Sequence, residues 1–479
     1  MVQLAGYIAE QTAYHHGEVS LHHTIINMAQ DFVGSNNVPL LTAGGQFGTR
    51  AQGGNDYASP RYIFTSLSPL SRYIFPQADD GQLEHLTEDG SPVEPKFYIP
   101  IIPFLLVNGS QGIGTGWSCF VPPHNTLHLV DHVKRRVRGE SAGPPLVPWI
   151  RGFKGKIIMG DSSLSPSSKD RDTLYTYGVV KQSEKSLNNI EVTELPYGRW
   201  TEDFKDQLIV MHEKGLIRGF TEHHSANNVK FEIAVSRPQR DALEIMPGVE
   251  SLVGLICSFR LEGKISMRNM HCYDRNGQIK RYKTAEDICA DHFEIRLEAY
   301  ERRKKALAAK FQIDAEVARN KCRFVTDILN GNLEIIGPST SSSSSARQAS
   351  SGSATVPLAL HRVAREGELL SQMRRMGYSS LENLEMLSGK NSSGSGSGSG
   401  SGATEEGASR TKKASSTKGS FGYLLDMPIH SLTEERVVSL RGTAEEANAK
   451  LKALLATSEK DLWMRDLDAL EVHAEAISR

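Results

Sequence analysis

The chain has 479 residues, enough for two to four domains, and 39% of them are hydrophobic, which supports substantial cores. No apolar run approaches the ~20 residues of a membrane-spanning helix, and the five cysteines lack CxxC spacing, which argues against a zinc site or a disulfide framework. The 55 basic and 56 acidic residues give a net charge of −1, which counts against a nucleic-acid binder unless basic residues are concentrated locally.

The first predicted element is an amphipathic helix. Its apolar stripe has helical spacing and predicts one buried face, formed by Leu21, Ile25, Met28 and Phe32. Two pairs of adjacent histidines lie in the same region: His15, His16, His22 and His23. Adjacent histidines lack the i, i+4 geometry of a HExxH zinc site, so a metal site is the disfavoured interpretation.

A glycine-rich segment, residues 44–54, leads to a loop that ends in Pro60-Arg61-Tyr62. Glycines let the backbone approach a ligand closely, and Pro60 stiffens the turn that presents Tyr62. A tyrosine hydroxyl, with an ordinary pKa of about 10, is a weak nucleophile. A neighbouring guanidinium lowers that pKa and neutralises a phosphate, and Arg61 is such a neighbour. The pattern is compatible with a nucleophile, but from these residues alone ordinary packing is the favoured interpretation.

The same four letters, RYIF, occur again at residues 72–75. Leu67, Leu70 and Ile74 have the spacing of one face of a helix, so we interpret Tyr73 as a structural residue. Farther on, the apolar run 101–107 predicts a buried strand, and Ile113 follows between glycines. An isoleucine on a turn either packs in a core or serves as a wedge that unstacks a base step.

Residues 121–283 alternate strand-like segments and turns, with a helix at 201–214, which is typical of an α+β unit. Thr284 opens the longest predicted helix, which nothing interrupts before Gly331 and which spans on the order of 70 Å. Its partner is expected in the last segment, where residues 434–441, 445–457 and the stretch after Ser458 favour helix. Serine-rich and glycine-rich tracts at 339–353 and 388–420 predict flexible coil.

Three long stretches resemble the breakage-reunion region of eukaryote-type DNA topoisomerase II: YHHGEVSLHHTIINMAQDFVGSNN, GGQFGTRAQGGNDYASPRYIFT and YIPIIPFLLVNGSQGIGTGW. The resemblance extends in order over almost the whole chain. It implies that Tyr62 attacks a DNA phosphodiester to form a 5′-phosphotyrosine, with Arg61 as its phosphate-binding helper. It also places His15 and His16 in the cleavage pocket and makes Ile113 the wedge. Further DNA contacts are expected from Gln46, Arg50, Lys154 and Lys156, with solvated surface as the alternative for either lysine.

The resemblance implies an α+β multidomain fold with a winged-helix domain, an α/β tower domain and a long antiparallel coiled-coil arm that ends in a helical dimer gate. The expected division is a winged helix at 1–120, a tower at 121–283, an outgoing arm with gate helices at 284–387, a flexible linker at 388–420 and a return arm at 421–479. Exposed apolar residues of the last segment, among them Leu462, Trp463 and Leu467, are expected to form a second dimer contact.

The implied function is the DNA breakage-reunion core of an ATP-dependent type II topoisomerase, working as a homodimer on double-stranded DNA in the nucleus. Mg²⁺ and ATP would be bound by Toprim and ATPase domains of the same polypeptide that this chain lacks, so no metal site is expected in it. One alternative is the A-subunit of gyrase or topoisomerase IV, but those proteins end in β-propeller blades and this chain ends in predicted helices. A non-cleaving DNA-architectural protein is another, which the intact Arg61-Tyr62 pair disfavours.

Overall fold

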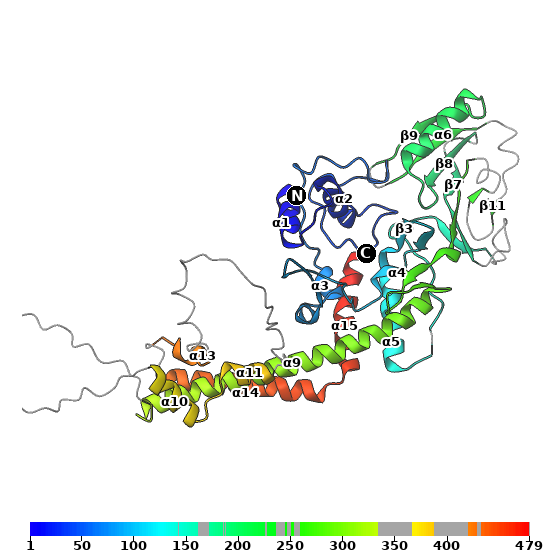
Figure 1. Cartoon of the computed structure of the whole chain (residues 1–479). Coiled ribbons are helices and arrows are strands. Elements are labelled where there is room, and N and C mark those ends of the chain that lie inside the picture. Colours follow the sequence, from blue (N-terminus) through cyan, green and yellow to red (C-terminus); the bar gives the residue numbers. More distant parts are fainter. Residues whose placement is uncertain are drawn as a thin grey trace, which may run out of the picture. The chain divides into compact units, whose positions relative to one another are not determined.

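The computed structural model describes residues 1–141, 143–160, 172–184, 186, 188–225, 228–235, 245–246, 251–252, 259–333, 366–387, 420–428 and 433–478. The chain divides into two units, Met1–Glu301 with Glu459–Arg479, and Arg302–Ser458 (Figure 1). Both helices and sheets are present, as the α+β expectation requires. The predicted flexible tract at 339–353 and nearly all of that at 388–420 lie outside the described residues. No helix in the described ranges combines the length and apolar character needed to cross a membrane.

The N-terminal part of the first unit is built around two short helices, α1 (Val2–Gln11) and α2 (Glu18–Ala29). The predicted stripe is largely buried, but α2 ends before Phe32 because Gln30 takes an extended conformation. Ile26 and Ala29 pack with Phe47 and Ile63, so α2 supports the loop that carries Tyr62. The elements that follow are α3 (Ser71–Ile74), the 3₁₀ helix η1 (Gln77–Gln82), β1 (His85–Glu88), β2 (Ser91–Pro95), α4 (Phe104–Asn108), β3 (Ser110–Gly114), β4 (Trp117–Val121) and α5 (Thr126–Arg138).

Most of the run 101–107 is buried as expected, but the predicted strand is wrong. The chain forms the short helix α4 there, and Pro103 occupies its N-cap position. A proline suits the start of a helix, since the first turn does not need its missing N–H group. A short apolar run shows no periodicity that separates a buried strand from a buried helix.

The largest core joins α3, α4 and α5 to the first part of α9 (Ala285–Leu329) and to the last helix, α15 (Glu459–Ser478). In Figure 1, α15 lies beside α5 and α3. Trp463 is fully buried, donates its indole N–H to the Ile101 carbonyl at 2.9 Å and stacks on Phe293. Leu467 is also fully buried. The exposed apolar patch predicted around Trp463 is therefore wrong, because these side chains fill a core within one chain.

A second core belongs to two antiparallel sheets and the helix α6 (Thr201–Glu213). Figure 1 shows α6 against the strands. The first sheet has the order β7-β8-β10-β9 and the second the order β13-β6-β5. Their strands are β5 (Lys156–Met159), β6 (Thr173–Tyr177), β7 (Val179–Gln182), β8 (Asn189–Glu194), β9 (Gly219–Glu222), β10 (Phe231–Ala234) and β13 (Glu262–Ser266). The largest core includes α5, which begins after residue 120. The domain boundary expected at residue 120 stays a prediction.

The other described elements of the first unit are short. They are β11 (Ile245–Met246), β12 (Ser251–Leu252), η2 (Met267–Asn269), β14 (His271–Tyr273) and β15 (Ile279–Arg281). The 45-residue α9 begins as predicted, because the Asp287 amide donates to the Thr284 hydroxyl and the Thr284 amide donates to Asp287, each at 3.2 Å.

In the second unit α9 packs beside α14 (Glu434–Ala456), and a cavity of about 370 Å³ lies between the two helices. The predicted break near residue 442 is absent, since α14 continues through Gly442. A smaller core includes Phe324, Met373, Tyr378 and Leu424. It brings together α9, α10 (Glu366–Arg375) and α13 (Gly422–Leu425); α11 (Leu381–Leu387) completes the described helices of this unit.

Candidate active site and nucleic-acid interface

Tyr62 lies in a loop whose backbone is held on both sides. Its amide donates to the Ser59 carbonyl at 2.9 Å, and Phe64 and Gly44 exchange two backbone hydrogen bonds of 2.8 and 2.9 Å. Ile63 is only 1% exposed and packs on α2, whereas Tyr62 is 70% exposed and Arg61 is exposed as well. The structure thus presents the phenol and the guanidinium to solvent from a fixed backbone, as a nucleophile that acts on a large substrate requires.

The glycine-rich segment is fixed by close backbone packing. Gly48 and Gly54 have φ angles of +100° and +86°, and a Cβ on Gly48 would lie 2.4 Å from the Gly54 carbonyl oxygen. The Gln30 side chain donates to the carbonyls of Phe47 and Gly54 at 2.9 and 3.0 Å. These positions therefore need glycine, and Gln30 at the end of α2 locks the segment. Gln46 remains exposed on it. Gln30 was not predicted from the sequence, because its partners lie 17 and 24 residues away.

Arg50 does not lie where the sequence suggested. It is 5% exposed, pairs with the buried carboxylate of Glu194 at the end of β8, and donates to the Leu195 carbonyl at 3.5 Å. The Arg50 and Ala51 carbonyls in turn accept the first amides of α6, from Thr201 at 3.4 Å and Glu202 at 3.1 Å. Arg50 therefore joins the glycine-rich segment to the second core and does not present its guanidinium to solvent.

His15 and His16 are exposed between α1 and α2, with ring centroids 4.5 Å apart. The preceding Tyr14 packs against the α2 residues Leu21 and Ile25. Both this turn and the Tyr62 loop therefore rest on α2. The exposed face of α2 also carries His23, whose ring lies 5.5 Å from that of Tyr57. Sequence reasoning treated His23 only as a disfavoured metal ligand.

Ile113 lies at the end of a β-hairpin formed by β3 and β4. The strands pair Gly114 with Trp117, which leaves Thr115 and Gly116 as the turn, with φ +76° at Gly116. Ile113 is 89% exposed, so the core-packing alternative is excluded. Trp117 is also exposed, and its ring lies 5.4 Å from that of His271. An exposed apolar side chain on a rigid hairpin suits insertion between bases.

Lys154 and Lys156 are exposed at the beginning of β5. The Lys154 ammonium donates to the Asn228 side chain at 3.0 Å, while its backbone amide donates to Glu194 at 3.0 Å. In the described part of the chain, no group of three or more His, Cys, Asp or Glu side chains has a geometry that would hold a metal ion.

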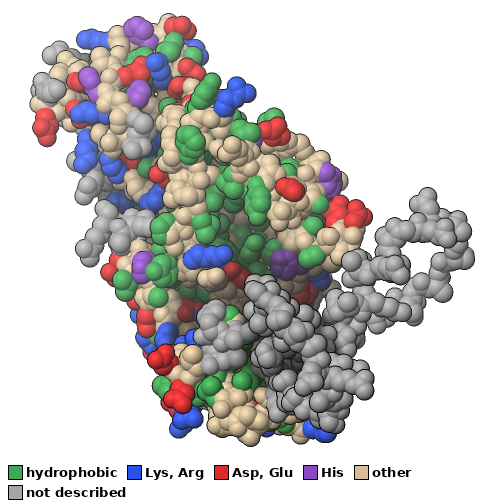
Figure 2. Space-filling view, turned by 90° about the vertical axis from the view of Figure 1, so that its left-hand side faces the viewer, with side chains coloured by type: hydrophobic (Ala, Val, Ile, Leu, Met, Phe, Trp, Pro, Cys, Tyr) green, Lys and Arg blue, Asp and Glu red, His purple; other side chains and the backbone are tan. Residues whose placement is uncertain are grey.

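Exposed apolar side chains continue beyond Tyr62. In Figure 2, hydrophobic side chains gather into a broad area on the face shown. Large exposed apolar residues in the first unit include Phe64 and Leu67, which follow Tyr62 closely, and the pair Phe97 and Tyr98. Contiguous exposed apolar surface is typical of an interface with another macromolecule.

Known proteins resemble this chain over most or all of its length. The family model for the A-subunit of DNA gyrase/topoisomerase IV matches residues 1–468. The chain is 42% identical over 337 residues, 70% of its length, to "DNA topoisomerase 2, mitochondrial" of Dictyostelium discoideum, and 35% identical over its whole length to "DNA topoisomerase 2" of Arabidopsis thaliana. It spans 25% and 30% of the lengths of these two relatives.

A solved structure shares the fold over the complete chain. It is the DNA-binding, cleavage and re-ligation domain of Plasmodium falciparum topoisomerase II, with a TM-score of 0.79, 32% identity and coverage of 58% of that chain. The agreement with eukaryotic relatives over the full length favours the topoisomerase II resemblance over the gyrase alternative. The chain therefore belongs to the type IIA topoisomerase family that the gyrase/topoisomerase IV model describes, and its similar relatives are the eukaryotic topoisomerase 2 proteins.

Proposed function

We propose that this chain is the DNA breakage-reunion core of a type II topoisomerase. The observation that carries the proposal is the presentation of Tyr62 and Arg61 to solvent from a loop fixed by Gly44, Ser59 and the buried Ile63. The family membership supports the same reaction.

In the proposed reaction the Tyr62 phenol oxygen attacks the phosphorus of a DNA phosphodiester. A bond forms between that oxygen and phosphorus, and the bond from phosphorus to the 3′ oxygen breaks. One side of the broken strand then ends in a free 3′ hydroxyl, which takes up a proton as the phenol loses one, and the other side is attached to the protein as a 5′-phosphotyrosine. Arg61 neutralises the phosphate, and His15 and His16 donate hydrogen bonds to its oxygens. Resealing is the reverse reaction, so the covalent bond conserves the energy of the broken phosphodiester.

DNA would contact several parts of the first unit. Gln46 binds the backbone near the cleavage site, Ile113 enters a base step, and Lys154 and Lys156 bind phosphates farther along the duplex. Arg50 has a different role here, because its ion pair with Glu194 holds the segment that carries Gln46.

The longer protein to which this chain corresponds would work as a homodimer, in which each Tyr62 cuts one strand and a second duplex passes through the paired break. The exposed apolar side chains near Tyr62 support the proposal that another protein surface packs against this part of the chain. Mg²⁺ and ATP would bind to Toprim and ATPase domains of that longer polypeptide. The nucleus is the expected location, although the name of the Dictyostelium relative places that protein in mitochondria.

The test mixes the chain with a separately supplied Toprim fragment, Mg²⁺ and plasmid, and then measures DNA covalently attached to protein. Tyr62→Phe should abolish attachment while duplex binding stays nearly unchanged, because only one hydroxyl is lost. Tyr73→Phe is the matched control and should leave cleavage intact. If the Tyr73 variant were inactive and the Tyr62 variant active, the assignment of the nucleophile would be wrong.

A further inference from the structure

Two cysteines that are distant in sequence lie side by side in the first unit. Cys119 on β4 and Cys272 on β14 have their Sγ atoms 3.8 Å apart, although 153 positions separate them. Both side chains are half-buried. A disulfide bond has an S–S length of about 2.05 Å, so the sulfur atoms need to approach by only about 1.8 Å.

The backbones around the two thiols are already held together. Cys119 lies on the hairpin that carries Ile113, directly across from Gly112. The neighbouring residues of β4 also contact the segment that contains Cys272: Asn269 donates to the Ser118 hydroxyl at 2.8 Å, and the Trp117 and His271 rings lie 5.4 Å apart. These successive contacts fix the approach of β4 to β14, so the short S–S distance does not depend on the two side chains alone.

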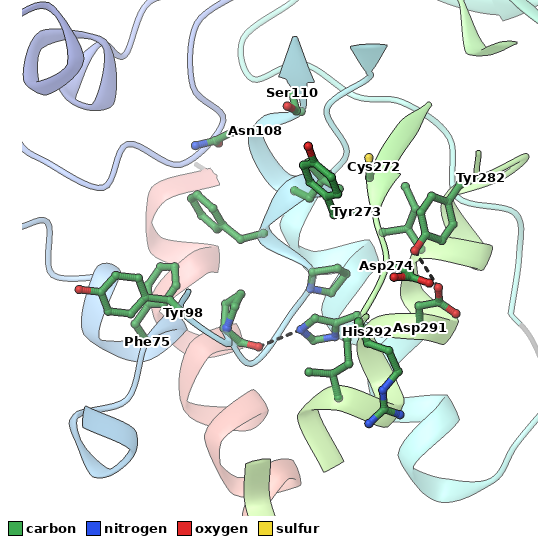
Figure 3. Close-up of a pocket in the computed structure, with 18 residues that line it drawn as sticks. Phe75, Tyr98, Asn108, Ser110, Cys272, Tyr273, Asp274, Tyr282, Asp291 and His292 are labelled. Atoms are coloured by element: carbon green, nitrogen blue, oxygen red, sulfur yellow. Dashed lines mark hydrogen bonds between the residues drawn. The ribbon is translucent and has the colours of Figure 1, made fainter. Parts of the chain in front are cut away.

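A pocket gives solvent a path to Cys272. It has a volume of about 550 Å³, and its wall includes Cys272, Tyr273, Ser110 and Phe104. Figure 3 shows Cys272 on the strand that also carries Tyr273, at the end of the pocket where Ser110 lies. A small oxidant that enters this pocket reaches the Cys272 sulfur without unfolding of the surrounding core.

We propose that Cys119 and Cys272 are a site of oxidative modification, at which a hydroperoxide converts the two thiols into a disulfide bond. One thiolate attacks the peroxide oxygen, which breaks the O–O bond, releases water or an alcohol and leaves a sulfenic acid. The second sulfur then attacks the sulfenic sulfur, and the displaced hydroxide takes up the proton of that thiol as water. Two electrons leave the sulfur atoms and reduce the peroxide.

The environment makes Cys272 slow to react at neutral pH. Burial, and then the neighbouring Cys119, raise the pKa of Cys272 to about 12, so its thiol stays protonated. Because thiolates are the reactive species, formation of the disulfide should accelerate as the pH rises. The bond would tie the Ile113 hairpin to the strand pair β14 and β15, which precedes α9.

The test treats the whole chain with hydrogen peroxide, blocks the remaining thiols by alkylation and identifies linked peptides by mass spectrometry without reduction. The parent should yield one linkage, between Cys119 and Cys272, and more of it at alkaline than at neutral pH. The linkage should be absent from Cys119→Ser and Cys272→Ser and retained in Cys322→Ser, a control whose half-buried thiol contacts the Val437 carbonyl at 3.7 Å.

A second readout covers the case in which a serine variant folds poorly. Oxidation should raise the melting temperature of the parent and of Cys322→Ser, because the disulfide closes a long loop, and a reductant should reverse the shift. Cys272→Ala, compared before and after peroxide, should show no such rise. The proposal is overturned if the folded parent gives no Cys119–Cys272 peptide at alkaline pH, or if either thiol links to a different cysteine instead.

Discussion

At the scale of single residues, identical local sequences have different environments in this fold. Tyr62 and Tyr73 both occur in RYIF, but Tyr73 is half-buried in α3 and its ring stacks on His473 with centroids 3.9 Å apart. In both copies the isoleucine after the tyrosine is buried, Ile63 on α2 and Ile74 in the largest core. The copies differ because His473 covers the ring of Tyr73, whereas Tyr62 is exposed.

Ile113→Ala should reduce DNA bending and change the sites that are cut, because a methyl group is too short to remain inserted in an opened base step. Energy transfer between dyes at the two ends of a duplex measures the bend. The melting temperature of the free protein should stay nearly unchanged, since the side chain is exposed. An unchanged bend would exclude the wedge.

Arg50→Ala should lower the free energy of unfolding by about 3–5 kcal/mol, because it leaves the buried Glu194 carboxylate without its counter-charge. Urea unfolding measures the loss. Lys205→Ala is the matched control, since Lys205 pairs with Glu222 near the surface and removal of a solvent-screened ion pair should cost far less than removal of the Arg50 pair. Equal losses in the two variants would show that the Arg50 pair contributes no more than a surface ion pair.

The first unit should lose stability in mild acid. His124 is fully buried, and this burial lowers its pKa from 6.5 to about 4. In the unfolded chain His124 binds a proton below about pH 6.5, whereas in the folded chain it binds one only near pH 4. The contribution of neutral His124 to the free energy of unfolding is therefore present at neutral pH and is lost as the pH falls through this range. The expected loss between pH 7 and pH 5 is ~2 kcal/mol.

Urea unfolding of the parent and of His124→Gln at both pH values isolates this contribution. The parent should lose ~2 kcal/mol more than the variant between pH 7 and pH 5, because the other titrating groups are common to both proteins. An identical pH dependence would mean that His124 titrates normally in the folded chain.

At the scale of elements, the capped start of α9 was easier to predict than the packing partner of α15. The start of α9 follows from Thr284 and Asp287, three residues apart, because a capping interaction is local. The place of α15 does not follow from its sequence, because an apolar stripe shows that a helix needs a partner without showing which one. Trp463, expected to face a second chain, packs against Ile101 and Phe293 of its own chain.

Trp463→Ala should therefore destabilise the folded chain by about 3–5 kcal/mol, through the cavity it leaves and the lost hydrogen bond to Ile101. Thermal unfolding measures the effect. Leu455→Ala, at an exposed position of α14, is the control and should change stability by less than ~0.5 kcal/mol. If Trp463→Ala weakened self-association in sedimentation without lowering the melting temperature, the dimer contact expected from the sequence would be restored.

At the scale of the whole molecule, the sequence supported the family, the mixed helix and sheet composition and the exposure of Ile113. It did not reveal the partners of Arg50 or Cys272, because those contacts join positions 144 and 153 residues apart. The partner of Arg50 could not be predicted from its own segment, because a guanidinium in a glycine-rich segment can bind either a phosphate or a buried carboxylate. Only the fold brings Glu194 to it.

The burial of Trp463 against Ile101 also has a consequence for synthesis on the ribosome. These two residues lie 362 positions apart, so the last helix of the largest core is translated long after the first strands and helices around it. At about 5–20 residues per second, the delay is roughly 20–70 s. During that time the nascent chain displays the apolar groove that Trp463 and Leu467 later fill. The emerging protein should therefore depend on chaperones that bind exposed apolar surface until α15 leaves the exit tunnel.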